Sequence, residues 1–92
     1  MNKQEYLNKL PEVIHYIENT DFEQIEPKIK YYDYVLLLSK LGSMLRDEAY
    51  DSAYNQLTAI VYGYHCQSDN RVAETLKKIL MRDCDANGVS YE

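Results

Sequence analysis

The spacing of its apolar residues is the feature that most constrains how this chain can fold. In the first segment the apolar positions are Tyr6, Leu7, Leu10, Val13, Ile14 and Ile17. Steps of three and four residues place them along one stripe of an α-helix. Asn2 is a candidate cap, with Glu5 three residues later. Because Pro11 lacks an N–H and crowds the preceding turn, we expect the helix to be kinked or broken there.

A longer helix is predicted to follow. Thr20 and Glu23 have the spacing of a capping box, and Pro27 suits the first position of the helix. Its apolar residues form two stripes, one of Ile29, Tyr32 and Leu36 and one of Tyr34, Leu38, Leu41 and Leu45. A helix that is apolar on two sides is expected to be the central one. Gly42-Ser43 is expected to weaken it or end it early.

The second half of the chain predicts two more helices. The apolar positions are Ala49, Ala53, Leu57, Ile60, Val61 and Tyr64 in residues 48–66, and Val72, Ala73, Leu76, Ile79 and Leu80 after the cap candidates Ser68-Asp69-Asn70. Four helical segments with short connections predict an all-α fold, a compact bundle in a single domain over residues 1–92. The alternative is an α+β fold with strands near 29–38 and 58–64, which are rich in tyrosine, valine and isoleucine.

Composition limits the class of protein. With 92 residues, 46% of them hydrophobic, the chain can form one core and is too apolar for a disordered protein. No apolar signal-peptide region follows Met1, and the longest apolar run, residues 34–38, is far shorter than the ~18 residues that indicate a membrane span. We therefore expect a soluble, cytoplasmic protein. Cys66 and Cys84 are expected to be free thiols, because disulfides are rare in the cytosol.

A short motif at the end of the chain resembles a metal-binding loop. Asp83-Cys84-Asp85-Ala86-Asn87-Gly88 matches the first six positions of a calcium-binding EF-hand loop. The bidentate glutamate at the twelfth position would be residue 94, whereas the sequence ends at Glu92. We interpret the motif as a helix stop followed by a polar tail. A weak calcium site at Asp83, Asp85 and Asn87 is the alternative.

The sequence carries no signature of catalysis. His15, His65, Cys66 and Cys84 have no spacing that would bring two metal ligands onto one helical face, so structural roles are expected. With three glycines in all, the sequence has neither a glycine-flanked nucleophile nor a phosphate-binding loop. We expect a binding protein rather than an enzyme, with no cofactor.

The aromatic residues suggest where such binding takes place. The chain has ten tyrosines, one phenylalanine and no tryptophan. Tyrosine packs its ring while its hydroxyl stays hydrogen-bonded, so a small core close to the surface is the simplest explanation. Tyrosine is also enriched at protein interfaces. The possible interface residues are Tyr31, Tyr32, Tyr50 and Tyr54.

The charges are segregated along the chain, and we place the function in two acidic segments without lysine or arginine. Their carboxylates are Glu12, Glu18, Asp21, Glu23 and Glu26 in the first and Asp47, Glu48, Asp51 and Asp69 in the second. Like charges at helical spacing cost a few tenths of a kcal/mol each, so such runs indicate a role other than stability. A solvated face of an acidic protein is the plain alternative.

Net charge indicates the kind of partner. A net charge of -5 and a pI of about 4.9 repel nucleic acid and anionic membranes and suit a basic protein. A globule of this length is ~32 Å across, and DNA duplex of that length carries roughly 19 charges. The chain has only 15 carboxylates. Imitation of DNA therefore requires either that the carboxylates gather on one face or that two chains line up, so a homodimer is expected.

In its size, its two acidic segments and its tyrosine-rich, lysine- and asparagine-bearing residues 1–34, the chain resembles the small DNA-mimicking anti-restriction proteins of phages, most of all the Arn type of the T-even phages. The resemblance implies a dimer whose acidic surface occupies the DNA-binding cleft of a host restriction nuclease. The first hypothesis is therefore an acidic inhibitor of a basic, DNA-binding host protein. The alternatives are an immunity- or adaptor-type helical module that binds through its tyrosines, and a weak calcium-linked regulator.

Overall fold

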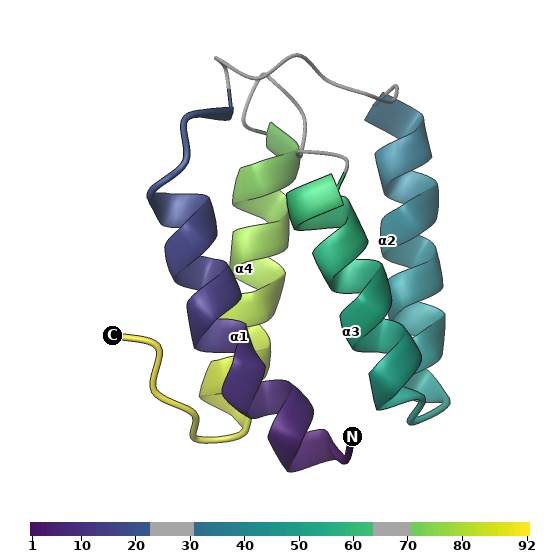
Figure 1. Cartoon of the computed structure of the whole chain (residues 1–92), viewed down its shortest axis with the longest axis vertical. Coiled ribbons are helices and arrows are strands. Elements are labelled where there is room, and N and C mark those ends of the chain that lie inside the picture. The colour runs from purple at the N-terminus through teal and green to yellow at the C-terminus, as the bar shows by residue number, and fades with distance from the viewer. Residues whose placement is uncertain (23–30, 64–70) are drawn as a thin grey trace.

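The computed structural model describes residues 1–22, 31–63 and 71–92, which form a bundle of α-helices (Figure 1). The helices are α1 (Lys3–Glu18), α2 (Tyr31–Arg46), α3 (Tyr50–Thr58) and α4 (Arg71–Ala86), and a π-helical turn, η2 (Ala59–Gly63), extends α3. The described residues contain no strand, and residues 31–38 and 58–63 are helical. The predicted all-α bundle is confirmed.

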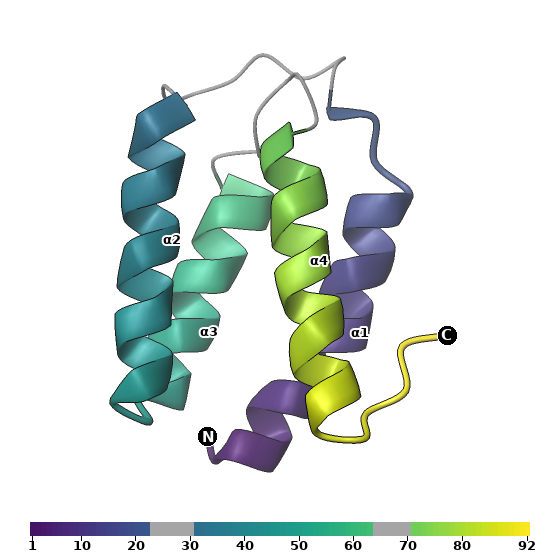
Figure 2. The ribbon, with the colours of Figure 1, turned by 180° about the vertical axis from the view of Figure 1, so that it is seen from behind.

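The helices pack in pairs and alternate in direction along the chain (Figures 1 and 2). α1 packs on α4, α2 packs on α3, and α3 also contacts α1. α4 lies on the far side of the bundle in Figure 1 and on the near side in Figure 2. The molecule measures 33 × 27 × 17 Å, with a radius of gyration of 12.5 Å. α3 is thus the helix that joins the two pairs.

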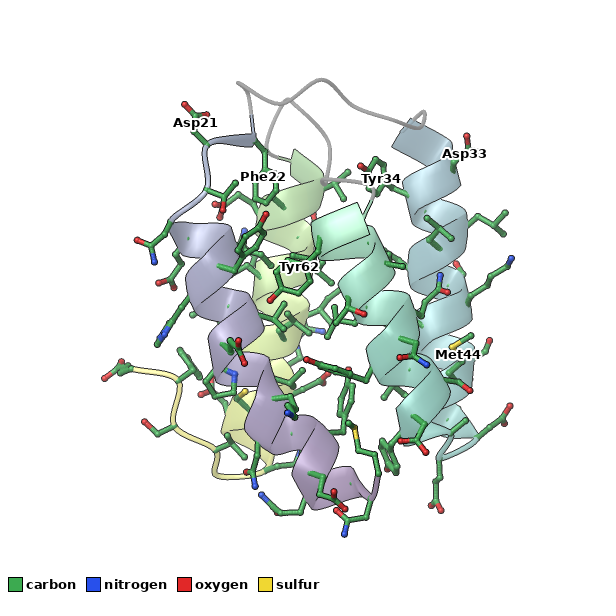
Figure 3. The ribbon with its side chains drawn as sticks, in the orientation of Figure 1. Asp21, Phe22, Asp33, Tyr34, Met44 and Tyr62 are labelled. Carbon is green, nitrogen blue, oxygen red and sulfur yellow. The ribbon has the colours of Figure 1, made fainter. Side chains whose placement is uncertain are left out.

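The prediction that the helix with two apolar stripes is the central one is wrong. α2 lies at one edge of the bundle (Figures 1 and 2). Tyr34 and Leu41 are its buried hydrophobic residues among those described, and Figure 3 shows Tyr34 pointing toward the middle of the bundle. Val35 and Leu36, on its outer side, are 46% and 56% exposed. Leu36, the one member of the stripe Ile29, Tyr32 and Leu36 whose side chain is described, is therefore exposed instead of packing on a second helix.

Two sequence features expected to interrupt helices lie inside them. Pro11 lies within α1, which is a single helix that changes direction near its middle (Figures 1 and 2), so the expected kink is a bend without a break. Gly42-Ser43 lies within α2, which continues to Arg46, so the expected early end is wrong. In both helices the buried apolar residues outweigh the local cost of proline or glycine.

The predicted cap of α1 is present. The Asn2 side-chain oxygen accepts a hydrogen bond from the Glu5 N–H at 2.9 Å, and the Glu5 carboxylate accepts one from the Asn2 N–H at 3.2 Å. The Thr20 hydroxyl instead donates to the Tyr16 carbonyl at 2.6 Å, so it closes the end of α1. Glu23 and Pro27, which complete the second predicted helix start, lie outside the described residues.

Every described helix contributes buried side chains to one core. The six apolar residues predicted for the first stripe are all at most 4% exposed. The fully buried aliphatic side chains of the other elements include Leu57, Ile60, Val61, Leu76 and Leu80. No polar or charged side chain of the described residues is buried. Their charged groups therefore lie at the surface or in its cavities, where a partner or ligand can reach them.

Candidate acidic binding surfaces

Three carboxylates of the second acidic segment lie in and beside the α2–α3 turn, at one end of the molecule. Asp47 and Glu48 are exposed in this turn, and Asp51 is exposed in the first turn of α3. The Ala49 N–H donates to the Met44 carbonyl at 2.8 Å, and the Glu48 N–H donates to the Leu45 carbonyl at 3.2 Å. These two bonds form a Schellman motif, which ends a helix with one residue in the left-handed conformation.

Glu48 occupies that left-handed position, with a φ of 58°. The position favours glycine, because a Cβ atom there crowds the neighbouring carbonyl. Glu48 is the only non-glycine residue with positive φ in the described parts of the chain. This position thus holds a glutamate, although the backbone conformation alone would favour glycine.

The carboxylates of the turn are only partly neutralised. The Met1 ammonium forms an ion pair with Asp51 at 2.8 Å, and the hydrogen bond from this ammonium to Asp51 raises the pKa of the Met1 amino group. The Asp51 side chain is nevertheless 75% exposed. Asp47 and Glu48 form no ion pair with any described residue. The turn therefore offers two unpaired carboxylates and one paired carboxylate to solvent.

Part of the first acidic segment lies at the opposite end of the bundle. Glu18 and Asp21 line a cavity of about 300 Å³, whose other wall includes Glu74 and Lys77 of α4. Lys77 pairs with Glu74 at 3.3 Å. Figure 3 shows Asp21 pointing outward beyond the end of α1, while Phe22 points into the bundle. Sequence reasoning missed Glu74, because it lies among lysines in the sequence and joins Glu18 and Asp21 only through the packing of α4 on α1.

Glu12 lies at a third place, beside a cluster of aromatic rings between α1 and α3. The rings of Tyr16 and Tyr62 meet edge to face with centroids 4.5 Å apart, and Tyr16 also contacts Phe22 at 6.3 Å. Figure 3 shows Tyr62 pointing from η2 toward α1. Burial, and then the charge of Glu12, raises the pKa of the Tyr62 phenol. Glu12 and Glu18 lie six residues apart on α1, so at about 3.6 residues per turn they project from different sides of this helix, and Glu18 lines the cavity shared with α4.

The structure thus distributes the described carboxylates of the two segments over three places. The α2–α3 turn and Asp21 lie at opposite ends of the long axis (Figures 1 and 3). Glu23, Glu26 and Asp69 lie outside the described residues. A single chain does not gather the described carboxylates onto one face.

The predicted interface tyrosines that are described make contacts within the chain. The Tyr50 ring lies 5.7 Å from that of Tyr6, and the Lys9 ammonium lies 6.0 Å from the centre of the Tyr54 ring. Both tyrosines are half-buried. Tyr31 and Tyr32 open α2, and their side chains lie outside the described part of the chain. These contacts fit the expected use of tyrosine in a small core, while an interface role stays a prediction.

The motif that resembles a calcium loop is the end of α4. Asp83 and Asp85 lie in the last helical turn. The Val89 N–H donates to the Cys84 carbonyl at 2.9 Å, the Gly88 N–H donates to the Asp85 carbonyl at 3.4 Å, and Gly88 has a φ of 68°. This is a second Schellman motif, so the interpretation as a helix stop is confirmed. No group of three or more histidine, cysteine or acidic side chains among the described residues is arranged to hold a metal ion.

Residues beyond this stop fold back onto α1. Val89 and Tyr91 are half-buried against the core, and the His15 ring donates a hydrogen bond to the Tyr91 carbonyl. Cys84 is a free, fully buried cysteine, and burial raises the pKa of its thiol. Cys84 is thus buried, whereas His15 is exposed, and His65 and Cys66 lie outside the described residues.

No protein-family model, curated protein or solved structure matches this chain. In the described ranges, no helix has both the length and the apolar character needed to cross a membrane.

Proposed function

We propose that this protein is an acidic inhibitor that binds a basic, DNA-binding protein and occupies the surface on which that protein binds DNA. The observation that carries the proposal is the backbone of Glu48. A non-glycine residue in the left-handed region costs about 1 to 2 kcal/mol, and strained residues of this kind are concentrated at functional sites. The Glu48 side chain is exposed and forms no hydrogen bond or ion pair with the described residues that would offset this cost. We attribute its carboxylate to binding.

The neighbouring charges favour a basic partner. Asp47 and Glu48 have no counter-ion among the described residues, so a lysine or arginine of a partner can pair with them without first displacing another cation. Glu18 and Asp21 offer a second acidic place at the other end of the 33 Å axis. Over that length a DNA duplex carries roughly 19 charges, so two copies of a chain with net charge -5 imitate it better than one.

The second copy is proposed to pack on the outer side of α2. Val35 and Leu36 are exposed there, and burying these apolar side chains in a contact would lower the free energy. Residues 35–46 contain no aspartate or glutamate. Since the chain carries a net charge of -5, two copies repel each other least where carboxylates are absent. An α2–α2 contact would leave the α2–α3 turns of both copies at the surface.

Light scattering coupled to size-exclusion chromatography tests this contact. The wild-type protein is expected at twice the 10.8 kDa mass of the chain. Leu36→Glu is expected to be monomeric, because it introduces a carboxylate into the contact. Asn55→Glu makes the same change of charge at an exposed position of α3 and is expected to stay dimeric. A monomeric wild-type protein would overturn the dimer.

Competition with DNA tests the inhibitor proposal itself. The immobilised protein is exposed to cell lysate at low salt, and bound proteins are eluted either with duplex DNA or with polyglutamate of equal total charge. Duplex DNA is expected to release DNA-binding proteins at a lower concentration of charge than polyglutamate does. The Asp47→Asn/Glu48→Gln variant is expected to capture far less of these proteins. Asp85→Asn/Glu92→Gln removes the same charge elsewhere on the exposed surface and is the matched control. Equal release by both polymers, or equal capture by both variants, would contradict the proposal.

A tyrosine-based binding module is the second candidate, and the aromatic cluster between α1 and α3 favours it. Tyr16, Tyr54 and Tyr62 are each half-buried, and the rings of Tyr16 and Tyr62 meet edge to face. In this case capture is expected to resist salt and to be lost in Tyr54→Ala, while the Asp47→Asn/Glu48→Gln variant binds normally. The two candidates therefore give opposite results with the same two variants.

A further inference from the structure

A cavity of about 230 Å³ lies beside the α2–α3 turn, since Leu45 and Tyr50 flank that turn, and all four helices or the residues next to them contribute to its wall. α1 contributes Lys3, Tyr6 and Leu7, and the facing wall includes Leu45 of α2, Tyr50 of α3 and Asp83 of α4. Its volume is below the ~300 to 1,000 Å³ of pockets for drug-sized ligands. An occupant of this cavity is therefore a small molecule of few heavy atoms.

Tyr6 contributes to this wall, and its hydroxyl has no partner within the described structure. The Tyr6 side chain is 2% exposed, and its hydroxyl oxygen is buried without a hydrogen bond. Burial, and then the charge of Asp83, raises the pKa of this phenol well above its usual range, so the hydroxyl is a stable donor. Native structures rarely leave a buried polar atom unpaired, and such an atom beside a cavity indicates a missing bonding partner.

Two opposite charges line the same cavity without pairing. The Asp83 carboxylate is half-buried and forms neither a hydrogen bond nor an ion pair with the described residues. Burial raises the pKa of Asp83, and the neighbouring Arg82 only partly opposes this effect. Lys3 is exposed at the rim and likewise forms no ion pair with any described residue. A cation alone would leave Lys3 unpaired, and an anion alone would leave Asp83 unpaired.

We propose that this cavity binds a small zwitterion, an α-amino acid with a short aliphatic side chain. Its ammonium group pairs with the Asp83 carboxylate and its carboxylate pairs with the Lys3 ammonium, while the Tyr6 hydroxyl donates to a polar atom of the ligand. Its side chain packs on Leu7 and Leu45, the aliphatic residues of the wall. This proposal does not depend on the acidic surfaces or on their partner.

Titration with three related ligands, followed by the backbone amide signals in NMR, tests the proposal. L-leucine carries both charges, L-leucinamide lacks the carboxylate, and N-acetyl-L-leucine lacks the ammonium. We expect saturable shifts around Tyr6, Leu45 and Asp83, with L-leucine binding at least about tenfold more tightly than either derivative, because each loses one charge-assisted contact. If either derivative binds as tightly as L-leucine, or if no saturable shift occurs, the proposal is wrong.

Variants on two helices separate binding from folding. Asp83→Asn is expected to weaken L-leucine and L-leucinamide about tenfold or more, whereas Asp85→Asn, two residues along the same helix and outside the cavity, is expected to leave both unchanged. Lys3→Gln, at an exposed position, is expected to weaken L-leucine and N-acetyl-L-leucine but not L-leucinamide. Tyr6→Phe is expected to lower the affinity for L-leucine several-fold. Equal affinities for L-leucine in the Asp83→Asn and Asp85→Asn variants would overturn the site.

Discussion

The backbone conformation of Glu48 is a property of one residue that can be measured directly. Its φ of 58° is strained for any residue with a Cβ atom. Glu48→Gly is expected to raise the free energy of unfolding by about 0.5 to 1 kcal/mol, since the relief of strain exceeds the added entropy of the unfolded chain. Urea denaturation measures the difference.

Asp47→Gly is the matched control, because Asp47 precedes Glu48 in the same turn and does not have a positive φ. That substitution gains nothing from relief of strain and is expected to lower the free energy of unfolding. A Glu48→Gly variant no more stable than the wild type would show that the left-handed position carries no cost here, and it would remove the main support for placing the binding function in this turn.

Asp83 is expected to make the folded state less stable as pH rises, whereas a carboxylate in an ion pair has the opposite effect. Burial raises the pKa of Asp83 in the folded state, so this state binds the proton more tightly than the unfolded chain. The stability that this proton contributes is present at low pH and is lost as pH rises through the raised pKa of Asp83. At neutral pH, Asp83→Asn is therefore expected to be more stable than the wild type, by less than about 1 kcal/mol.

Urea denaturation at several pH values checks this expectation. The advantage of Asp83→Asn should shrink as the solution is acidified below the pKa of Asp83, because the wild-type carboxyl is then neutral as well. Asp85→Asn removes the same charge at an exposed position of the same helix and is the control for the loss of charge. An advantage of Asp83→Asn that grows on acidification would contradict the assignment.

At the scale of helices, the spacing of apolar residues predicted most of the fold. The stripe from Tyr6 to Ile17 is buried as expected, since three- and four-residue steps leave only one way to remove these side chains from water. The position of α2 could not be predicted in the same way. Leu36 belongs to a predicted apolar stripe, and only the packing of the other helices shows that it is exposed.

The candidate sites were less predictable, because each depends on contacts between distant segments. The acidic residues were visible in the sequence, but their separation into three places follows from the packing of the helices. Tyr6 and Asp83 share a cavity although they come from opposite ends of the chain. In the sequence Tyr6 is simply one member of an apolar stripe, and no local pattern indicates that its hydroxyl lacks a partner.

Two glycines at different places in helices give contrasting predictions. Gly42 lies inside α2, and an added Cβ atom would meet only the Arg46 side chain at 3.7 Å, an ordinary contact. Gly42→Ala is therefore expected to raise the free energy of unfolding by about 1 kcal/mol, because alanine restricts the unfolded chain and favours the helix. Gly88→Ala is the control, since open space surrounds Gly88 but its φ is 68°.

We expect Gly88→Ala to lower the free energy of unfolding by about 1 kcal/mol, through backbone strain alone. Thermal and urea denaturation of both variants provide the comparison. The same sign for the two substitutions would show that side-chain crowding or loss of dimerisation, rather than backbone conformation, determines their effect. Gly42 lies on the helix proposed to form the dimer contact, so Gly42→Ala should also be examined by light scattering.

At the scale of the whole molecule, the unpaired carboxylates make the charge distribution unfavourable for folding. The net charge is -5, and although Asp51 and Glu74 form ion pairs, Asp47, Glu48 and Asp83 form none with the described residues. Raising the ionic strength from ~0.01 to ~0.15 M shortens the Debye length from about 30 to about 8 Å and screens this repulsion. Tm is expected to rise by roughly a few degrees.

Calorimetry at the two ionic strengths measures the shift in Tm. The Asp47→Asn/Glu48→Gln variant should have the higher Tm at low ionic strength and a smaller rise with salt, because it lacks two of the repelling charges. If Tm instead falls as salt is added, favourable ion pairs outweigh repulsion in this protein. This result would contradict the proposal that its carboxylates are unpaired until a partner binds.

The edge-to-face contact between Tyr16 and Tyr62 can also be followed spectroscopically in the unlabelled protein. The chain has no tryptophan, so tyrosine dominates its near-ultraviolet circular dichroism and fluorescence. Two rings with centroids 4.5 Å apart in a fixed chiral arrangement give a signal that reports on the α1–α3 contact without any label. A partner that binds the tyrosine cluster would alter the near-ultraviolet circular dichroism spectrum, whereas a partner that binds only the α2–α3 turn would leave this spectrum nearly unchanged.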